Sequence, residues 1–345
     1  MNSISKKKHS YRIKEELFIY LDDFGRVENL PFRYQDLLRF NYSVPLLDKK
    51  GKDSLWETVF FQPSETEELN DRLVKTYALM KVEGNVTLME HLYVDRIDFC
   101  PFGNSKPFRI RIKNQYNDNY DYYYVKLADA SRVYGLELED LLSPNRINFL
   151  VDSETLVEEH IIGIPGDQFV NNNLYVNGIN ETRLAKEFIK FNERCFIRLL
   201  GDMRSYNFVI DMTADFDDTQ FRFRAIDFDQ QSYEGKKALY LPQYFKENNP
   251  YVNLCVKLIN KETARQYQLE ERSLMARRLR IAQFRIASLL EVMIQDTISL
   301  PDKTEQLRRE LAQHYHRDSF LNCRNMGEIM RQSLNLLLEN SEQDF

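Results

Sequence analysis

Apolar and polar positions follow a strand-like pattern between residues 91 and 127. The segments 91–100 and 108–113 alternate between apolar and polar side chains, with one slip in the first, and 122–127 is aromatic and β-branched. Alternation of this kind is typical of a half-buried β-strand. Residues 101–107 and 114–119 between them are dense in turn formers. The pattern predicts three antiparallel strands joined by short turns.

The spacing of apolar residues changes from strand-like to helical in the next segment. Residues 130–142 have helical spacing and are stopped by Ser143-Pro144, because the residue before proline disfavours the helical region. Two apolar segments, 147–151 and 155–162, then predict two further strands before the glycine- and proline-rich break at 163–166. The expected order is therefore three strands, one helix and two strands.

Beyond residue 166 helical patterns dominate. We expect a helix over 181–200, a short strand pair at 208–210 and 221–226, and helices throughout 262–340. Upstream, residues 1 to about 88 form an extension whose fold the pattern does not name. Within it, a helix begins near Ser64, with a glutamate three residues later, and ends around Gly84-Asn85.

Bulk composition narrows the class of protein. The chain has 345 residues and 43% hydrophobic residues, enough for a two-lobed globular protein. Its net charge of −6 argues against a globally basic nucleic-acid binder. Four scattered cysteines without a Cys-x-x-Cys pair argue against structural zinc. With no signal peptide and no apolar run of membrane-spanning length, we expect a cytoplasmic protein without membrane contact.

One group of acidic and polar residues is a candidate for a catalytic site. The segment Gly201-Asp202-Met203-Arg204-Ser205-Tyr206-Asn207 precedes a predicted strand pair, and Ile226-Asp227-Phe228-Asp229 follows it, with Asp227 twenty residues after Asn207. This resembles the catalytic core of protein-kinase-like phosphotransferases, in which Asp-x-x-x-x-Asn, a hairpin and a metal-binding Asp follow in that order. The Gly-Asp start and the Ile-Asp-Phe-Asp ending are most similar to the aminoglycoside and choline kinase branch.

The resemblance implies an α+β, protein-kinase-like two-lobed fold. A small antiparallel β lobe would span 89–165 and a mainly helical lobe 166–345, after the extension 1–88. ATP and magnesium would be the cofactors. By likeness, Asp202 would orient the attacking hydroxyl, Asn207 and Asp227 would be metal ligands, and Arg204 would neutralise transition-state charge.

The resemblance extends upstream. Lys126 ends a strand in Tyr-Tyr-Val-Lys, similar to the kinase lysine that contacts phosphates, and its usual partner would be Glu137, with Glu139 as the fallback. Glu137 shares a helix face with Val133 and Leu141. The turn at Gly103 would cover the phosphates. The segment 157–161 would be the hinge, where Glu159 and Ile161 would hold adenine through their backbones.

Some residues depart from the family pattern and leave alternatives open. Leu200 stands where this group commonly has His, the turn at Gly103 has one glycine rather than three, and no Ala-Pro-Glu segment follows Asp229. Asp229 is either a second metal ligand or, as we prefer, a hydrogen-bond acceptor that fixes its loop.

Three hypotheses follow. The first is an ATP- and magnesium-dependent phosphotransferase acting on a hydroxyl of a small molecule or protein. The second is a pseudokinase that binds nucleotide or acts as a scaffold, and the third is a non-enzymatic α+β interaction protein. The sequence leans towards an enzyme without deciding it. The arginine-rich helix at 277–285 is either a solvated face or a docking surface for an anionic protein partner.

Overall fold

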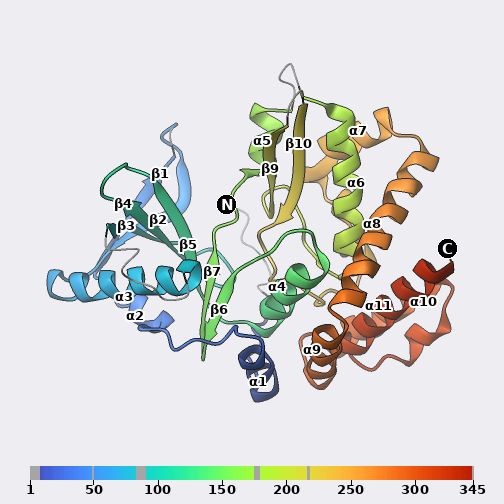
Figure 1. The fold of residues 1–345 in the computed structure, drawn as a ribbon, viewed down its shortest axis with the longest axis horizontal. Helices are drawn as coiled ribbons and strands as arrows, with labels where there is room; N and C mark the ends of the chain where they lie inside the picture. The colour runs from blue at the N-terminus through green and yellow to red at the C-terminus, as the bar shows by residue number, and fades with distance from the viewer. Residues whose placement is uncertain (1–7, 49, 83–90, 175–178, 216–217, 344–345) are drawn as a thin grey trace. The chain divides into compact units, whose positions relative to one another are not determined.

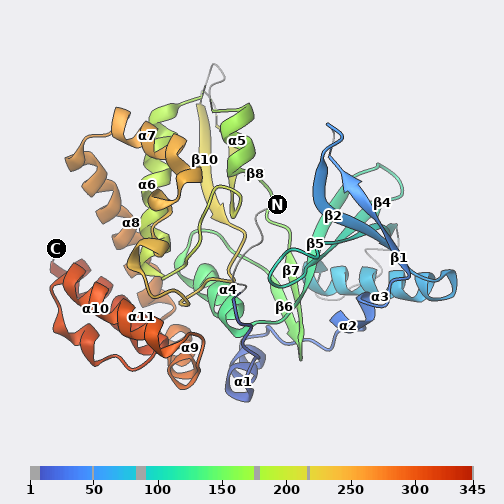
Figure 2. The ribbon, with the colours of Figure 1, turned by 180° about the vertical axis from the view of Figure 1, so that it is seen from behind.

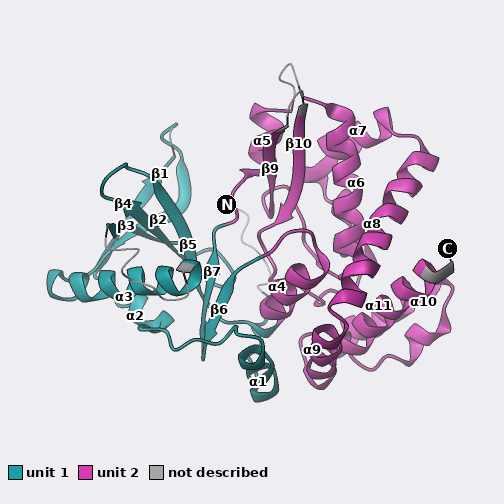
Figure 3. Cartoon of the chain, in the orientation of Figure 1, with its two compact units in different colours: residues 1–130, 147–160 teal, residues 131–146, 161–345 magenta. Residues whose placement is uncertain are grey.

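The chain divides into two compact units in the computed structural model, which describes residues 8–48, 50–82, 91–174, 179–215 and 218–343. Unit 1 comprises residues 1–130 and 147–160, and unit 2 comprises 131–146 and 161–345 (Figure 3). Each unit is described by itself. The domain ranges 1–88, 89–165 and 166–345 stay predictions.

Unit 1 is built on one antiparallel sheet of seven strands in the order β1-β2-β3-β4-β5-β7-β6. The strands are β1 (Tyr42–Leu47), β2 (Asp53–Phe60), β3 (Leu92–Phe99), β4 (Phe108–Asn114), β5 (Tyr120–Leu127), β6 (Phe149–Asp152) and β7 (Thr155–Glu159). Strand β5 pairs with β7 in a register that sets Lys126 opposite Leu156. The predicted meander and the two later strands are therefore confirmed.

The N-terminal extension supplies two strands and the helices of unit 1. These helices are α1 (Glu15–Asp23), α2 (Tyr34–Leu37) and α3 (Pro63–Val82). Helix α3 packs on the sheet at β3 (Figure 1), and its Leu73 and Tyr77 join a core with Ile110 and Val125 of the strands. The helix predicted from Ser64 is confirmed at its start, whereas its predicted end at Gly84-Asn85 lies outside the described residues.

Unit 2 is mainly helical. Its helices are α4 (Ala130–Leu142, from residue 131), α5 (Gly166–Asn172), α6 (Glu181–Ile197), α7 (Asn249–Leu258), α8 (Lys261–Ile281), α9 (Gln283–Gln295), α10 (Pro301–Tyr315) and α11 (Met326–Gln343). Helices α6 and α8 run side by side (Figure 2). A three-stranded sheet, β10-β9-β8, combines β8 (Ile164–Pro165), β9 (Phe208–Asp215) and β10 (Asp218–Ala225).

The elements that frame the candidate site agree with the sequence pattern apart from their ends. Helix α6 stops at Ile197 rather than residue 200, because Leu199 takes a left-handed backbone with φ of 52° that cannot continue a helix. The expected α+β class, with an antiparallel sheet and a mainly helical part, is confirmed. Among the described helices, none has the length and apolar character needed to cross a membrane.

Candidate phosphotransfer-type site in unit 2

The loop between α6 and β9 holds Asp202 in a strained backbone conformation. Asp202 has a φ of 57°, which a residue with a side chain adopts at a cost of about 1–3 kcal/mol. The loop is tied down by backbone bonds from the N–H of Gly201 to the carbonyl of Gln230 (3.2 Å) and from that of Asp202 to the carbonyl of Leu239 (3.1 Å). Strain of this kind is kept where surrounding structure enforces it, often at functional sites.

Asn207 closes the same loop. Its Nδ2 donates to the backbone carbonyl of Asp202 at 2.7 Å, and its own N–H donates to the carbonyl of Arg204 at 2.8 Å. The Asp-x-x-x-x-Asn spacing therefore forms one closed turn in which the amide of the last residue supports the backbone of the first. The two residues that the sequence singled out are brought together.

The β9–β10 hairpin returns the chain to this loop. After β10, the N–H of Ile226 donates to the carbonyl of Asn207 at 3.0 Å, which sets Asp227 next to the end of the loop. The N–H of Asp229 then donates to Oδ1 of Asp227 at 3.1 Å. A hairpin of this length is thus what aligns the second acidic segment with the first, as the sequence predicted.

A residue that the sequence reasoning missed, Arg132 of α4, occupies the acidic segment. Its Nη1 donates to Oδ1 of Asp227 at 2.9 Å and to Oδ1 of Asp229 at 2.8 Å, and its Nη2 to the carbonyl of Ile226 at 3.3 Å. The Arg132 side chain is 2% exposed, against 32% for Asp227. The signal in the sequence was an arginine beside the apolar residues Val133, Tyr134 and Leu136 of the helical segment, because an arginine buried there needs an anionic partner.

Helix α4 is fixed closely against this segment. Ser131 Oγ donates to the carbonyl of Gln231 at 2.7 Å, and a Cβ built on Gly135 would stand 2.9 Å from Cβ of Phe228. Only a glycine permits that approach, because real Cβ contacts are longer. The position of Arg132 is therefore held by packing on both sides of it and not by its ion pairs alone.

Asp202 lies among alternating charges. Nε of Arg204 donates to Oδ1 of Asp202 at 2.7 Å, and Nη1 of the same guanidinium donates to Glu247 at 2.8 Å. Burial raises the pKa of Asp202 above its ordinary value, opposed by Arg204 and supported by the charges of Glu234 and Glu247. A carboxylate with a raised pKa accepts a proton more readily, which suits a general base.

The acidic segment was tested as a magnesium site. Asn207 and Asp227 offer the amide and carboxylate oxygens that magnesium prefers. In this arrangement, however, Oδ1 of Asp227 already accepts from a buried guanidinium that cannot lose its charge. Within the described part of the chain, no cluster of three or more His, Cys, Asp or Glu side chains is suited to a metal ion. As arranged, the site does not fit magnesium.

The lysine expected to contact the phosphates, Lys126, and its expected partner, Glu137, belong to different units. Lys126 belongs to unit 1, where its Nζ donates to Oε2 of Glu158 at 2.7 Å, and both side chains are buried. Glu137 belongs to unit 2, where it is 0% exposed and accepts from Arg285 of α9, with Nη2 2.7 Å from Oε1. Glu139, the fallback, pairs with the buried Arg198. The roles of these residues towards a nucleotide stay predictions.

The remaining predicted site residues lie in ordinary local structure. Gly103 sits in a tight turn, where the Lys106 N–H donates to its carbonyl at 3.1 Å and the Lys106 carbonyl accepts from Tyr34 at 2.9 Å. Glu159 ends β7, and its Oε1 accepts from the N–H of Asn148 at 2.8 Å. Ile161 is 8% exposed in unit 2. Their proposed nucleotide contacts likewise stay predictions.

Comparison with known proteins gives weak likenesses. No family model matches the chain, and no curated protein matches it. Among solved structures, the chain is similar to titin kinase with its flanking domains at 13% identity and a TM-score of 0.28. That match covers 71% of this chain and 54% of the other, so the chain spans about half of that structure.

A second likeness is to the Neurospora crassa PAN3 pseudokinase, at 9% identity and a TM-score of 0.21, covering 81% of this chain and 71% of that one. A mutant of the same pseudokinase gives 10% identity and a TM-score of 0.20, with 96% and 71% covered. At TM-scores this low, none of these likenesses supports a conclusion about the chain. The aminoglycoside and choline kinase branch stays a prediction.

Proposed function

We propose that the chain is a kinase-like protein of the pseudokinase type, which keeps the phosphotransfer loop but does not use a metal at Asp227. The observation that carries this proposal is the buried guanidinium of Arg132 on Asp227 and Asp229. Phosphoryl transfer depends on divalent cations that bridge the phosphates and neutralise their charge. A fixed monovalent cation on the carboxylate that was expected to bind the metal would remove that function.

ATP is the proposed ligand of such a protein. Its proposed contacts are those expected from the sequence: Lys126, the turn at Gly103, and the backbone at Glu159 and Ile161. Because Arg132 already neutralises the carboxylate of Asp227, a phosphate would meet less negative charge at the acidic segment without needing magnesium. The protein would then bind nucleotide in chelator as well as in magnesium.

A second candidate, an ATP- and magnesium-dependent phosphotransferase, is favoured by a different observation. Asp202 is strained, has a raised pKa and is supported by Asn207, as a general base requires. In that function Asp202 would take the proton of a hydroxyl acceptor and Arg204 would neutralise developing charge. Asn207 and Asp227 would be the metal ligands.

Two measurements on the full chain separate the candidates. Thermal unfolding is followed with ATP in EDTA and with ATP in magnesium, and ATP turnover is measured for the wild type and for Asp202→Asn. The pseudokinase proposal expects an ATP-dependent rise in Tm of similar size in both buffers. It expects the same background turnover in both proteins.

Two outcomes of these measurements would reject the pseudokinase proposal. Magnesium-dependent turnover that is lost in Asp202→Asn establishes the phosphotransferase and rejects the pseudokinase. If ATP leaves Tm unchanged in both buffers, the protein does not bind nucleotide. The hypothesis that then remains is the non-enzymatic interaction protein.

A further inference from the structure

An exposed face of α8 and the start of α9 combines apolar and basic side chains. We call Leu274, Arg277, Arg278, Ile281 and Phe284 the basic strip. Ile281 is 76% exposed and Phe284 83% exposed, whereas Met275 and Leu279 on the other side of α8 are buried. Leu274, Arg277, Arg278 and Ile281 recur every three or four positions, so they share one side of α8. Phe284 follows at the start of α9, after the break at Ala282. Large apolar side chains exposed together in this way mark interaction surfaces.

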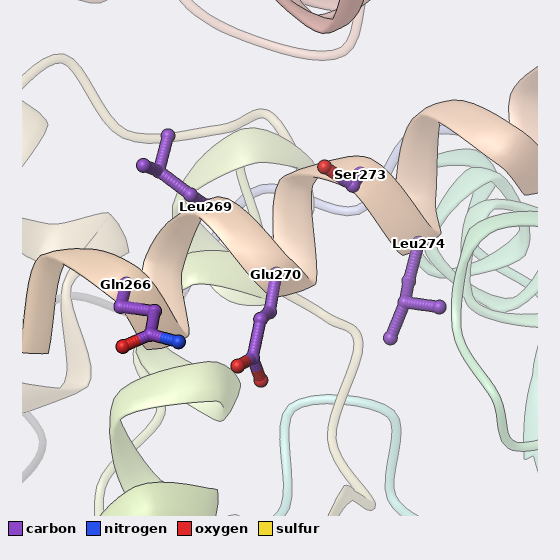
Figure 4. Close-up of a pocket in the computed structure, with 5 residues that line it drawn as sticks. All are labelled: Gln266, Leu269, Glu270, Ser273 and Leu274. Carbon is purple, nitrogen blue, oxygen red and sulfur yellow. The ribbon is translucent and has the colours of Figure 1, made fainter. Parts of the chain in front are cut away.

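The same face continues towards the start of α8 as a shallow hollow. Figure 4 shows its five lining residues, all on α8: Gln266, Leu269, Glu270, Ser273 and Leu274. Leu274 belongs to both the hollow and the basic strip. From Gln266 to Ile281 the face is about 22 Å long at 1.5 Å per residue. A docked helix would therefore have both a concave surface and an apolar row to cover.

The charge of the basic strip specifies an acidic occupant. Arg277 is exposed, and burial lowers the pKa of Arg278 below its ordinary value. Nη1 of Arg278 is buried and makes no hydrogen bond to any described residue. A buried donor without an acceptor costs about 1–3 kcal/mol, and it faces the interior, so the exposed Arg277 is the guanidinium that an acidic partner would reach.

The chain itself carries a helix of the complementary kind. Helix α1 in unit 1 buries Leu17, Tyr20 and Leu21 and exposes its other side. The exposed side, which we call the acidic strip, consists of Glu15, Glu16, Ile19, Asp22 and Asp23. Ile19 is 53% exposed at its centre. One apolar residue flanked by four carboxylates complements an apolar row flanked by two arginines in the sign of its charge.

We propose that the acidic strip of one copy of the chain docks on the basic strip of a second copy. This association is independent of nucleotide and of the proposed function. Because the two strips differ, a closed dimer requires two reciprocal contacts related by a twofold axis. Stable interfaces bury roughly 1,200–2,000 Å² in total, which favours a pair of helix contacts over a single one.

The first test is the mass of the full chain in solution. Sedimentation velocity across a concentration series should give a dimer at low salt that weakens as salt is added, because screening shortens the reach of the charges. Phe284→Glu should give a monomer with unchanged circular dichroism. Val256→Glu, at a residue 79% exposed on α7, is the matched control and should leave the dimer intact.

A charge exchange makes the assignment specific. Arg277→Glu alone and the double variant Glu16→Arg/Asp23→Arg alone should each be monomeric, because like charges then face each other. Mixed in equal amounts they should form a heterodimer, since both reciprocal contacts become complementary. A wild type that stays monomeric up to roughly 0.1 mM, or a mixture that fails to associate, would overturn the proposal.

Discussion

Arg132 and Asp227 are joined through a 2.9 Å bond from Nη1 to Oδ1, with the guanidinium almost fully buried. The same nitrogen reaches Asp229 at 2.8 Å. Two carboxylates that would repel each other are thereby held together without a metal ion. The bond links α4 to the acidic segment.

The first prediction is that removing this guanidinium exposes a divalent cation site. Arg132→Met should lose roughly 3–5 kcal/mol of unfolding free energy in EDTA, because it leaves the buried Asp229 and the partly exposed Asp227 without their cation. Manganese or magnesium should then restore part of the loss, by about 2.7 kcal/mol at a hundred times Kd. Tm in a metal titration without nucleotide, together with manganese paramagnetic resonance, measures both effects.

Arg132→Lys is the matched control for that variant. It keeps a positive charge and should show little response to metal. Should Arg132→Met not fold, Arg132→Met/Asp229→Asn removes one of the two carboxylates with the cation and allows the same titration. A wild type stabilised by manganese as strongly as the variant would show that Arg132 does not compete with the metal.

Local patterns were sufficient for most of the elements around the site. Alternation and turn residues located β3, β4 and β5, and the fixed spacing of Asp202, Asn207 and Asp227 placed them at one loop and hairpin. The strands β1 and β2 were not predicted. They carry exposed apolar residues such as Val44 and Leu55, so the local pattern of apolar and polar positions does not identify them as strands. Their pairing depends on parts of the sheet that are distant in the sequence.

The partners of charged residues were the part that sequence could not supply. Spacing placed Glu137 correctly on the inward face of α4, where it is buried. It could not show that Arg285, 148 residues later, donates to it. Likewise, it could not show that Glu158, on the neighbouring strand, accepts from the Lys126 ammonium within unit 1. Charge pairing across long sequence separations is decided by packing.

The second prediction concerns Lys126 and the stability of unit 1. Lys126→Met should lower the unfolding free energy by roughly 3–5 kcal/mol without any nucleotide, since it breaks a buried ion pair. Lys126→Met/Glu158→Gln should recover part of this, because it removes the charge as well as its partner. Urea unfolding of both variants measures the difference. Equal stability of the single variant and the wild type would contradict a structural role for this pair.

The third prediction is a pH dependence from the buried Glu139–Arg198 pair. Burial acts to raise the pKa of Glu139, but Arg198 overrides it and holds the pKa below the ordinary 4.5. A lowered pKa in the folded state means that the stabilisation is present above about pH 4.5 and is lost as the pH falls through the lower folded value. Glu139→Gln should therefore cost several kcal/mol at pH 7.

The measurement is urea unfolding of wild type and Glu139→Gln between pH 3 and pH 7. The difference between them should be constant at neutral pH and shrink at the acid end. Asp118→Asn, which removes the exposed partner of Lys113, is the control and should change little at pH 7. A gap that widens as the pH falls would show that Glu139 is not stabilised as a carboxylate.

The fourth prediction is that Glu137 anchors α4 to α9. Arg285 donates two hydrogen bonds to Glu137, from Nη2 to Oε1 at 2.7 Å and from Nε to Oε2 at 3.1 Å. These bonds join α9 to α4. In a double-mutant cycle, Glu137→Gln and Arg285→Gln should each destabilise the fold, while the double variant should lose less than their sum, with a coupling of about 1–3 kcal/mol. Arg285→Lys should also be destabilising, because a lysine cannot reproduce the planar two-point contact. Additive losses in urea unfolding would mean that the pair is not coupled and that Glu137 is buried for another partner.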